Sequence, residues 1–200
     1  TVTGEALLRW RKSDTQIVPA GEFISIAEQS GLMLDLNDWV IEEAAHAVGE
    51  WRRNGWPDAR VAVNVSAQQF ISGDFIGDLG RLLDRHGLTP DAIELELTEG
   101  VLQTGAITVE TLRSLRELGV ATSLDDFGTG YSSLTSLEQL PLTRVKLDRS
   151  MIADVDANPR AAAIARSIVG LCRSLGLQVT VEGVERASQF DIVAGFGEVS

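Results

Sequence analysis

Short aliphatic runs alternate along the chain with longer segments in which apolar residues recur every three or four positions. The short runs are typical of β-strands, and the longer segments are typical of amphipathic helices. Strands are predicted at residues 2–7, 61–65, 92–97, 120–124, 144–148 and 178–182. Helices are predicted near residues 20–30, 37–54, 74–87, 107–118, 133–139, 159–175 and 186–194. This alternation predicts an α/β fold with a parallel sheet, either doubly wound or closed as a TIM-type barrel.

The predicted strands each have one aliphatic face and one small or polar face. Successive residues of a strand point to opposite sides of the sheet, so the aliphatic face is expected to meet helices. On the polar face, a charged or amide residue lies toward the C-terminal end of every strand: Glu5, Asn64, Glu96, Asp125, Lys146 and Glu182. The C-terminal strand ends of a parallel barrel form its active-site rim. These side chains are therefore expected to share one pocket.

With Asp126, that pocket would hold five carboxylates, one amide and one ammonium group. Clustering and burial of carboxylates raise their pKa values, and divalent cations would relieve this repulsion. Oxygen ligands without Cys or a suitably placed His favour Mg²⁺ or Mn²⁺. Five carboxylates exceed what one Mg²⁺ usually takes from a protein, so two ions are expected. Two ions about 3.5–4 Å apart are typical of in-line displacement at phosphorus.

Composition narrows the class of protein. The chain has 200 residues, of which 44% are hydrophobic, and this is enough for one globular domain. A formal net charge of −12 argues against binding a nucleic-acid polymer. Cys172 is the only cysteine, which excludes a disulfide framework and favours a reducing, cytoplasmic location. The most apolar stretch, "AAAIARSIVGLC", is interrupted by Arg166 and is too short to span a bilayer. We expect no membrane contact by this segment, which leaves open a parent protein tethered to the inner membrane.

The stretch "SLDDFGTGYSSL", residues 123–134, contains adjacent carboxylates followed by two glycines. Asp125 and Asp126 would face opposite sides of a continuing strand, so both can serve one site only if the strand ends between them. Gly128 and Gly130 would supply the backbone freedom for that departure. The letters DFG also occur in protein kinases, but the chain lacks the accompanying glycine-rich, His-Arg-Asp and Ala-Pro-Glu motifs.

Six motifs occur in order across essentially the whole chain: "GEALLRW", "VNVSAQQF", "ELELTE", "DDFGTGYSSL", "LPLTRVKLDRS" and "VEGVE". Together they resemble the EAL-domain family of cyclic-di-GMP phosphodiesterases. The resemblance implies a TIM-like (β/α) barrel that hydrolyses cyclic di-GMP to linear pGpG with two Mg²⁺ or Mn²⁺ ions, as part of bacterial second-messenger signalling.

The resemblance also implies which residues bind the metal ions. Four residues resemble ligands of one ion: Glu5, Asn64, Glu96 and Asp125. Asp125 would bridge to a second ion, which Asp126 and Glu182 would hold. Asp126 is the weaker assignment of the adjacent pair. Whether Glu182 also acts as the general base stays open.

Further roles follow from the same resemblance. Lys146 resembles the residue that orients or polarises the attacking water, and Arg9 resembles a contact to a substrate phosphate. Asp148 resembles a neighbour of Lys146 on the substrate side. Glu99 resembles the glutamate that braces the "DFGTGYSS" loop, and Glu185 resembles a carboxylate that supports the ligands from behind.

The chain departs from the family pattern at its ends. The family usually carries a Gln-Pro-Ile-like strand before "GEALLRW" and a Gln-Gly-Tyr-like segment after "VEGVERASQF", and neither occurs here. We therefore expect residues 1–200 to be a single EAL-type domain that lacks the first and last strands of its barrel. The resemblance also implies a homodimer formed near the "DFGTGYSS" loop and an upstream sensor or GGDEF-type domain.

Other interpretations remain. A receptor that binds cyclic di-GMP without cleaving it is the main alternative, although no predicted ligand is missing. A different metal-dependent barrel, such as an enolase-like lyase, would leave the "DDFGTGYSSL" loop and Arg9 unexplained. Several other residues are expected to be structural: Glu94 paired with Arg144, His46 and His86 on helix surfaces, Trp10, Trp39, Trp51 and Trp56 against helices, and Cys172 buried in a helix.

Overall fold

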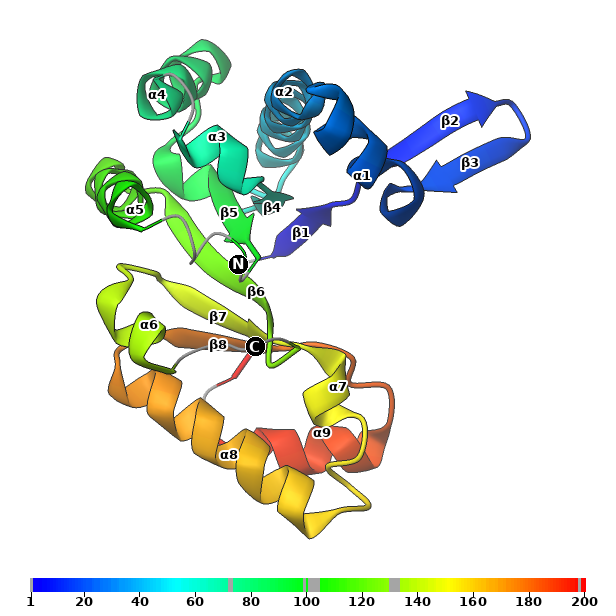
Figure 1. Ribbon diagram of the computed structural model, residues 1–200, viewed down its shortest axis with the longest axis vertical. Helices are drawn as coiled ribbons and strands as arrows, with labels where there is room; N and C mark the ends of the chain where they lie inside the picture. Colours follow the sequence, from blue (N-terminus) through cyan, green and yellow to red (C-terminus); the bar gives the residue numbers. More distant parts are fainter. Residues whose placement is uncertain (1, 72–73, 99, 101–104, 130–133, 198) are drawn as a thin grey trace. The chain divides into compact units, whose positions relative to one another are not determined.

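The computed structural model describes residues 2–71, 74–98, 100, 105–129, 134–197 and 199–200. These residues form two compact units (Figure 1). Unit 1 comprises Thr1–Glu96 and Glu117–Val120, and unit 2 comprises Leu97–Arg116 and Ala121–Ser200. The expectation of a single domain over residues 1–200 stays a prediction.

Unit 1 is built on a parallel sheet in which β4 lies between β1 and β5. Its elements are β1 (Thr3–Ala6), β2 (Arg9–Ser13), β3 (Gln16–Pro19), α1 (Ala20–Ser30), α2 (Met33–Arg53), β4 (Arg60–Asn64), α3 (Ala67–Ile71), α4 (Phe75–His86), the 3₁₀ helix η1 (Pro90–Ala92) and β5 (Ile93–Leu97). The core strand β5 is buried on both faces, with Ile93 and Leu95 fully inaccessible. Helices must therefore cover the aliphatic face.

The long helix α2 packs against β4 and α4. Its buried residues recur at helical spacing along one stripe: Met33, Asn37, Ile41, Ala44, Ala45, Val48 and Gly49. Burying such a stripe is the main source of stability for a surface helix, because helix propensity alone is weak. α4 is defined at both ends, by the Asp74 carboxylate that accepts from the Gly77 N–H and by Gly87 in the left-handed conformation.

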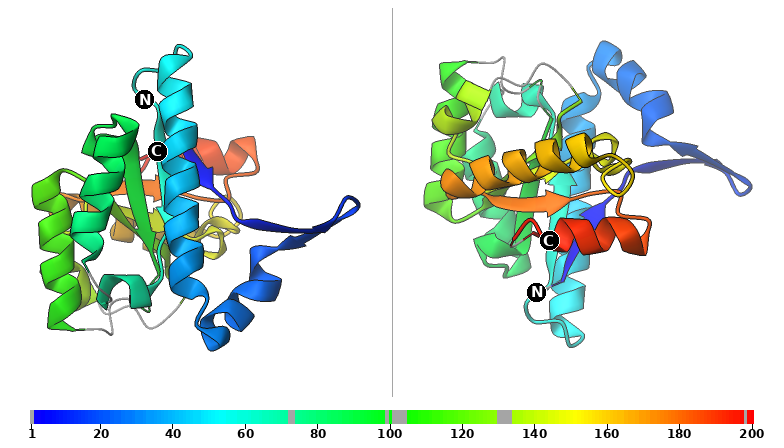
Figure 2. Two further views of the ribbon diagram at one scale, coloured as in Figure 1. Left: turned by 90° about the horizontal axis from the view of Figure 1, so that it is seen from above. Right: turned by 90° about the horizontal axis from the view of Figure 1, so that it is seen from below.

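The antiparallel hairpin β2–β3 was not predicted from the sequence. All five residues of β2 are exposed, so the strand lacks the apolar alternation by which strands are recognised. The hairpin projects away from the rest of unit 1 (Figure 2).

Unit 2 contains three parallel strands, of which β7 lies between β6 and β8. Its elements are α5 (Ala106–Leu118), β6 (Ala121–Phe127), α6 (Leu134–Gln139), β7 (Arg144–Leu147), α7 (Arg149–Ile152), α8 (Pro159–Ser174), β8 (Gln178–Val181) and α9 (Ala187–Ala194), and the last residues of α5 belong to unit 1. α8 lies along β8 and begins with an Asn158 cap followed by Pro159 (Figure 2). The backbone of Ser200 bonds to Val179 and Val181.

The predicted strands and their parallel pairing are confirmed within each unit, with ends that differ by at most three residues. The predicted helices are also found, and the short helices α3 and α7 were missed. One prediction is wrong. β6 does not end between Asp125 and Asp126 but continues to Phe127. No helix among the described residues is both long and apolar enough to cross a membrane.

Candidate active site

Unit 1 brings three of the predicted site residues together at the C-terminal ends of its strands. Asn64, the last residue of β4, lies directly opposite Glu96 of β5. Its Nδ2 donates to Glu5 Oε1 at 3.2 Å and to Glu96 Oε2 at 3.5 Å. The second distance is at the long limit for a hydrogen bond. A neutral amide therefore links two carboxylates that come from the strands on either side of it.

The loop after Asn64 is held in place by α2. Asn37, only 4% exposed, donates to Ser66 Oγ at 2.7 Å. Gln69 on α3 donates to Asp38 Oδ1 at 2.8 Å. These contacts fix the chain just beyond Asn64, so the position of the amide depends on polar side chains that lie on or next to the buried stripe of α2.

Unit 2 brings together a second set from its three adjacent strands. Lys146 Nζ on β7 lies 2.8 Å from Glu182 Oε1 and 3.1 Å from Asp125 Oδ1. Lys146 is 6% exposed and Asp125 is 8% exposed, whereas a third of the Glu182 side chain (33%) is accessible. An ammonium group thus lies between two carboxylates, which lowers the electrostatic cost of burying them together.

The end of β6 contains a bulge that accommodates the adjacent carboxylates. Leu124 pairs with Val145 and Phe127 pairs with Leu147, so two residues of β6 lie opposite Lys146 alone. Asp126 has a φ of 55°, the only positive φ among the described non-glycine residues. The bulge, and not the end of the strand, is therefore the local solution for two consecutive acids.

The electrostatics of Asp126 agree with a position in this cluster. Burial raises the pKa of its carboxyl group, and the nearby carboxylates of Asp125, Asp148 and Glu182 raise it further, whereas Lys146 lowers it. Gly128, two residues on, has a φ of 105°, and a Cβ there would lie 2.2 Å from Met151 Sδ. Only glycine fits this departure from β6. Gly130 lies outside the described residues.

The remaining predicted site residues have mixed outcomes. Asp148 caps α7, because its Oδ1 accepts from the Ser150 N–H at 2.8 Å, and hydrogen bonds from Ser150 lower its pKa. Arg9 is exposed on β2 and donates to the Leu8 carbonyl. Glu185 is exposed in the loop after β8. Their substrate-binding and supporting roles stay predictions. Glu99 lies outside the described residues, as do residues 130–133 of the "DFGTGYSS" loop near which a homodimer was predicted.

The donor atoms fit a hard divalent cation in their chemistry. Both sets offer only oxygen ligands, which Mg²⁺ and Mn²⁺ prefer. Asp125 Oδ1 is buried and accepts no hydrogen bond from the described residues, and its 3.1 Å contact with Lys146 Nζ is an ion pair. Among the described residues, no group of three or more His, Cys, Asp or Glu side chains is arranged to hold a metal ion. The predicted ligand set therefore stays a prediction.

Two of the residues expected to be structural lie where that role requires. His86 ends α4, and its Nε2 lies 2.7 Å from Glu42 Oε1, a contact that lowers the pKa of Glu42. Cys172 is fully buried in α8, and burial raises the pKa of its thiol.

The expectations for Arg144 and for the tryptophans are met only in part. Arg144 donates to Thr180, Gln178 and Ser200, and its predicted pairing with Glu94 stays a prediction. Trp10 contacts Phe23 of α1, yet all four tryptophans are at least 40% exposed.

The sequence patterns did not single out two buried side chains, Asn37 on α2 and Gln189 on α9. Each is a buried amide on an otherwise apolar helical stripe, and Gln189 shares its stripe with Val193. A polar residue at a core position of an amphipathic helix is the signal that could have found them, because a buried amide needs hydrogen-bond partners.

The EAL domain family matches residues 1–197, and the chain belongs to this family. It is 41% identical over 186 residues to the signaling protein YkoW of Bacillus subtilis, covering 92% of this chain and 23% of that protein. It is 38% identical over 186 residues to the cyclic di-GMP phosphodiesterase PdeR of Escherichia coli, covering 92% of this chain and 28% of that protein. The chain thus spans about a quarter of the length of these curated relatives.

The solved structures agree with this assignment. A structure described as the PaMucR phosphodiesterase in complex with c-di-GMP is 38% identical and superposes with a TM-score of 0.88, covering 96% of this chain and 78% of that one. The chain therefore has the α/β fold of EAL domains, which is of the TIM-barrel type, and the predicted fold class is confirmed.

Proposed function

We propose that this chain is a metal-dependent phosphodiesterase domain that hydrolyses cyclic di-GMP to linear pGpG. The observation that carries the proposal is the Lys146 ammonium, which contacts both Asp125 and Glu182 at the strand ends of a member of the EAL family. Support comes from a curated relative named as a cyclic di-GMP phosphodiesterase and from a related structure that contains c-di-GMP.

In this proposal both sets of residues act on one substrate and hold two Mg²⁺ or Mn²⁺ ions. The ligand oxygens belong to Glu5, Asn64, Glu96, Asp125, Asp126 and Glu182. Bound divalent ions supply a water of lowered pKa and offset the charge that develops on the phosphoryl oxygens. The buried Oδ1 of Asp125 supports this assignment, because it has an ion-pair contact with Lys146 but accepts no hydrogen bond from the described residues.

The side chains of this chain then orient the reaction. Lys146 donates a hydrogen bond to the attacking water and keeps it in line with the departing ribose 3′ oxygen. The water oxygen bonds to phosphorus as the bond to the 3′ oxygen breaks. The attacking water loses one proton and the departing oxygen gains one to become a 3′ hydroxyl, which opens the ring to linear pGpG. Arg9 contacts a substrate phosphate through its guanidinium group.

Glu182 has two candidate roles, as general base for the water or as a ligand only. Its Oε1 contacts Lys146, and a third of its side chain is accessible to solvent (33%). Glu182→Gln keeps a ligand oxygen but cannot take a proton. Loss of turnover with retained Mn²⁺ affinity in this variant indicates the base, and loss of both indicates the ligand.

The deciding experiment is incubation of the chain, and of the parent protein, with cyclic di-GMP and Mg²⁺, followed by chromatography for pGpG. We expect product, no product in EDTA, and none from Glu5→Ala. Binding of cyclic di-GMP without product would support the receptor. Turnover by Glu5→Ala at the wild-type rate, or equal turnover in EDTA, would contradict the metal assignment.

We also propose that the parent protein acts in cytoplasmic second-messenger signalling as a homodimer with a sensor or GGDEF-type domain upstream. The greater length of the curated relatives supports further domains. Light scattering of the parent protein tests the dimer, and a monomeric mass at micromolar concentration would exclude it.

A further inference from the structure

Gln189 is a fully satisfied amide buried at the start of α9. The side chain is 1% exposed. Its Oε1 accepts from the backbone N–H groups of Glu185 and Arg186, both at 2.9 Å. Its Nε2 donates to the carbonyls of Ile152 and Ala153 at 3.3 and 3.2 Å. Both lone pairs and both hydrogens of the amide are therefore used.

The two ends of this amide hold the segments that follow two site strands. Glu185 and Arg186 lie in the loop that begins at Glu182, immediately after β8. Ile152 and Ala153 end α7, which begins one residue after Asp148 and so follows β7 and Lys146 almost directly. A single side chain thus ties the loop of the carboxylate to the helix that follows the lysine.

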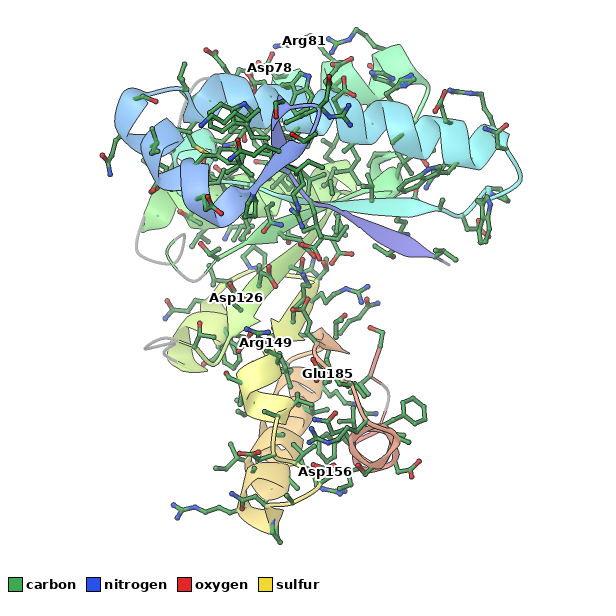
Figure 3. All side chains as sticks on the ribbon, turned by 90° about the vertical axis from the view of Figure 1, so that its right-hand side faces the viewer. Asp78, Arg81, Asp126, Arg149, Asp156 and Glu185 are labelled. Carbon is green, nitrogen blue, oxygen red and sulfur yellow. The ribbon has the colours of Figure 1, made fainter. Side chains whose placement is uncertain are left out.

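The same two segments also meet at a second point. The Glu182 N–H donates to the Leu147 carbonyl at 3.1 Å. Gly183 has a φ of 71°, and a Cβ there would lie 2.3 Å from Arg149 Cβ. Figure 3 labels Arg149 at the start of α7 and Glu185 in the neighbouring loop. With contacts at both points, the loop has little freedom to slide along α7, and Glu182 is held at a defined distance from Lys146.

We propose that Gln189 is a positioning residue that maintains the 2.8 Å contact between Lys146 Nζ and Glu182 Oε1. The inference rests on the proposed function, in which Lys146 orients the attacking water. Displacements of about 1 Å at a reacting group can lower turnover roughly a hundredfold. The hydrogen bonds of the Gln189 side chain to the described residues go to backbone groups, so its effect acts through the backbone on either side of it.

A second clamp on the same loop offers a matched control. The Arg186 guanidinium donates to Asp156 and to the Ala153 carbonyl. Half of the Arg186 side chain is exposed (49%), whereas only 13% of the Asp156 side chain is, and ion pairs that water reaches contribute little to structure. Arg186→Ala removes this outer clamp while its backbone N–H still donates to Gln189.

Two substitutions separate positioning from helix capping. Gln189→Glu keeps an oxygen for the N–H groups of Glu185 and Arg186 but cannot donate to the α7 carbonyls. Gln189→Met has similar size and loses both ends of the bridge. Circular dichroism at the assay temperature confirms that each variant is folded.

Turnover of cyclic di-GMP in Mg²⁺ is the first readout. We expect kcat to fall roughly ten- to a hundredfold in both Gln189 variants, with KM changed less than about threefold. Arg186→Ala should keep kcat within about twofold. If Gln189→Glu keeps the wild-type kcat, then Gln189 only caps α9, and the proposal is overturned.

The second readout does not depend on activity. Lys146 is almost inaccessible, so acetic anhydride should label it slowly in the wild type. Labelling measured by mass spectrometry should be several-fold faster in Gln189→Glu and unchanged in Arg186→Ala. If the wild type yields no pGpG, the proposed function fails. The positioning of Lys146 is then decided by labelling alone, and equal labelling of wild type and Gln189→Glu refutes it.

Discussion

The two sets of site residues are built alike but linked by different chemistry. In unit 1 the residue on the middle strand is Asn64, whose amide donates to Glu5 and Glu96 over 3.2 and 3.5 Å. In unit 2 the residue on the middle strand is Lys146, whose ammonium contacts its carboxylates over 2.8 and 3.1 Å. Contacts in which both partners are charged are shorter and stronger than those of a neutral donor.

Burial separates the two sets further. Lys146 and Asp125 are both under 10% exposed and Glu182 is a third exposed (33%), whereas Asn64 and Glu5 are exposed at the end of their strands and Glu96 alone of that set is buried (2%). Removing one partner of a buried ion pair leaves an uncompensated charge, and removing an exposed amide leaves groups that water can solvate. We therefore expect the set in unit 2 to matter for stability as well as for turnover, and the set in unit 1 mainly for turnover.

Lys146→Met should have the largest effect. It removes the donor proposed to orient the water, so kcat should fall roughly 10²–10³-fold. It also leaves Asp125 buried without its cation, and the free energy of unfolding in EDTA should fall by at least about 2 kcal/mol. Urea unfolding followed by far-UV circular dichroism measures this. An unchanged unfolding midpoint would show that Lys146 does not stabilise the buried carboxylate.

Asn64→Ala should lower turnover by less, roughly 10–100-fold, because it removes one predicted ligand and the link between two others. Its effect on the free energy of unfolding should stay below about 1 kcal/mol, since the hydrogen bond to Glu5 is exposed and the one to Glu96 is long, at 3.5 Å. All four tryptophans lie in unit 1, so their fluorescence during urea unfolding reports on the unit that carries the substitution. A larger loss of stability than in Lys146→Met would show that the set in unit 1, and not the set in unit 2, contributes more to stability.

Strand parity was sufficient to predict which residues meet within each unit. Asn64 and Glu96 are register partners, and Lys146 contacts carboxylates from the strands on either side, as the alternation of faces requires. The bulge at Asp125 and Asp126 could not be predicted in this way. It breaks the two-residue period itself, and it depends on the pairing of β6 with β7, which a single strand does not encode.

The hydrogen bonds of the buried amides Gln189 and Asn37 also could not be predicted from local sequence patterns. Gln189 bonds to Ile152 and Ala153, which are more than 30 positions away in the sequence, and Asn37 bonds to Ser66 across 29 positions. Each was hidden because its helix was read only for its apolar residues. The hairpin β2–β3 was missed for the opposite reason, since it buries almost no side chains.

Asp126→Asn should stabilise the chain. The raised pKa of Asp126 means that its ionised form is disfavoured in the folded state. Ionisation therefore lowers the stability of the folded chain at pH 7, and the lost stability returns as the pH falls below the ordinary pKa of 3.8. Asn removes the repulsion and tolerates the positive φ. We expect Tm in EDTA to rise by about 1–3 °C at pH 7, with a smaller gain at pH 4. A lower Tm at pH 7 would indicate that the carboxylate makes a stabilising contact, and Asp126 would then not be the repelled member of its set.

The smallest effect is expected from Asp156→Asn, which tests unit 2 away from the site. Hydrogen bonds from Arg186 and then Ser188 hold the pKa of Asp156 well below its ordinary value of 3.8. A lowered pKa contributes stability above that value and loses it as the pH falls toward the folded-state pKa. The variant should therefore melt slightly below the wild type at pH 7, and the two Tm values should converge as the pH is lowered below about 4. Because the pair lies on the outer side of the loop, kcat should stay within about twofold of the wild type. A drop in kcat as large as that of Gln189→Glu would mean that the outer clamp, and not the buried amide, holds Glu182 against Lys146.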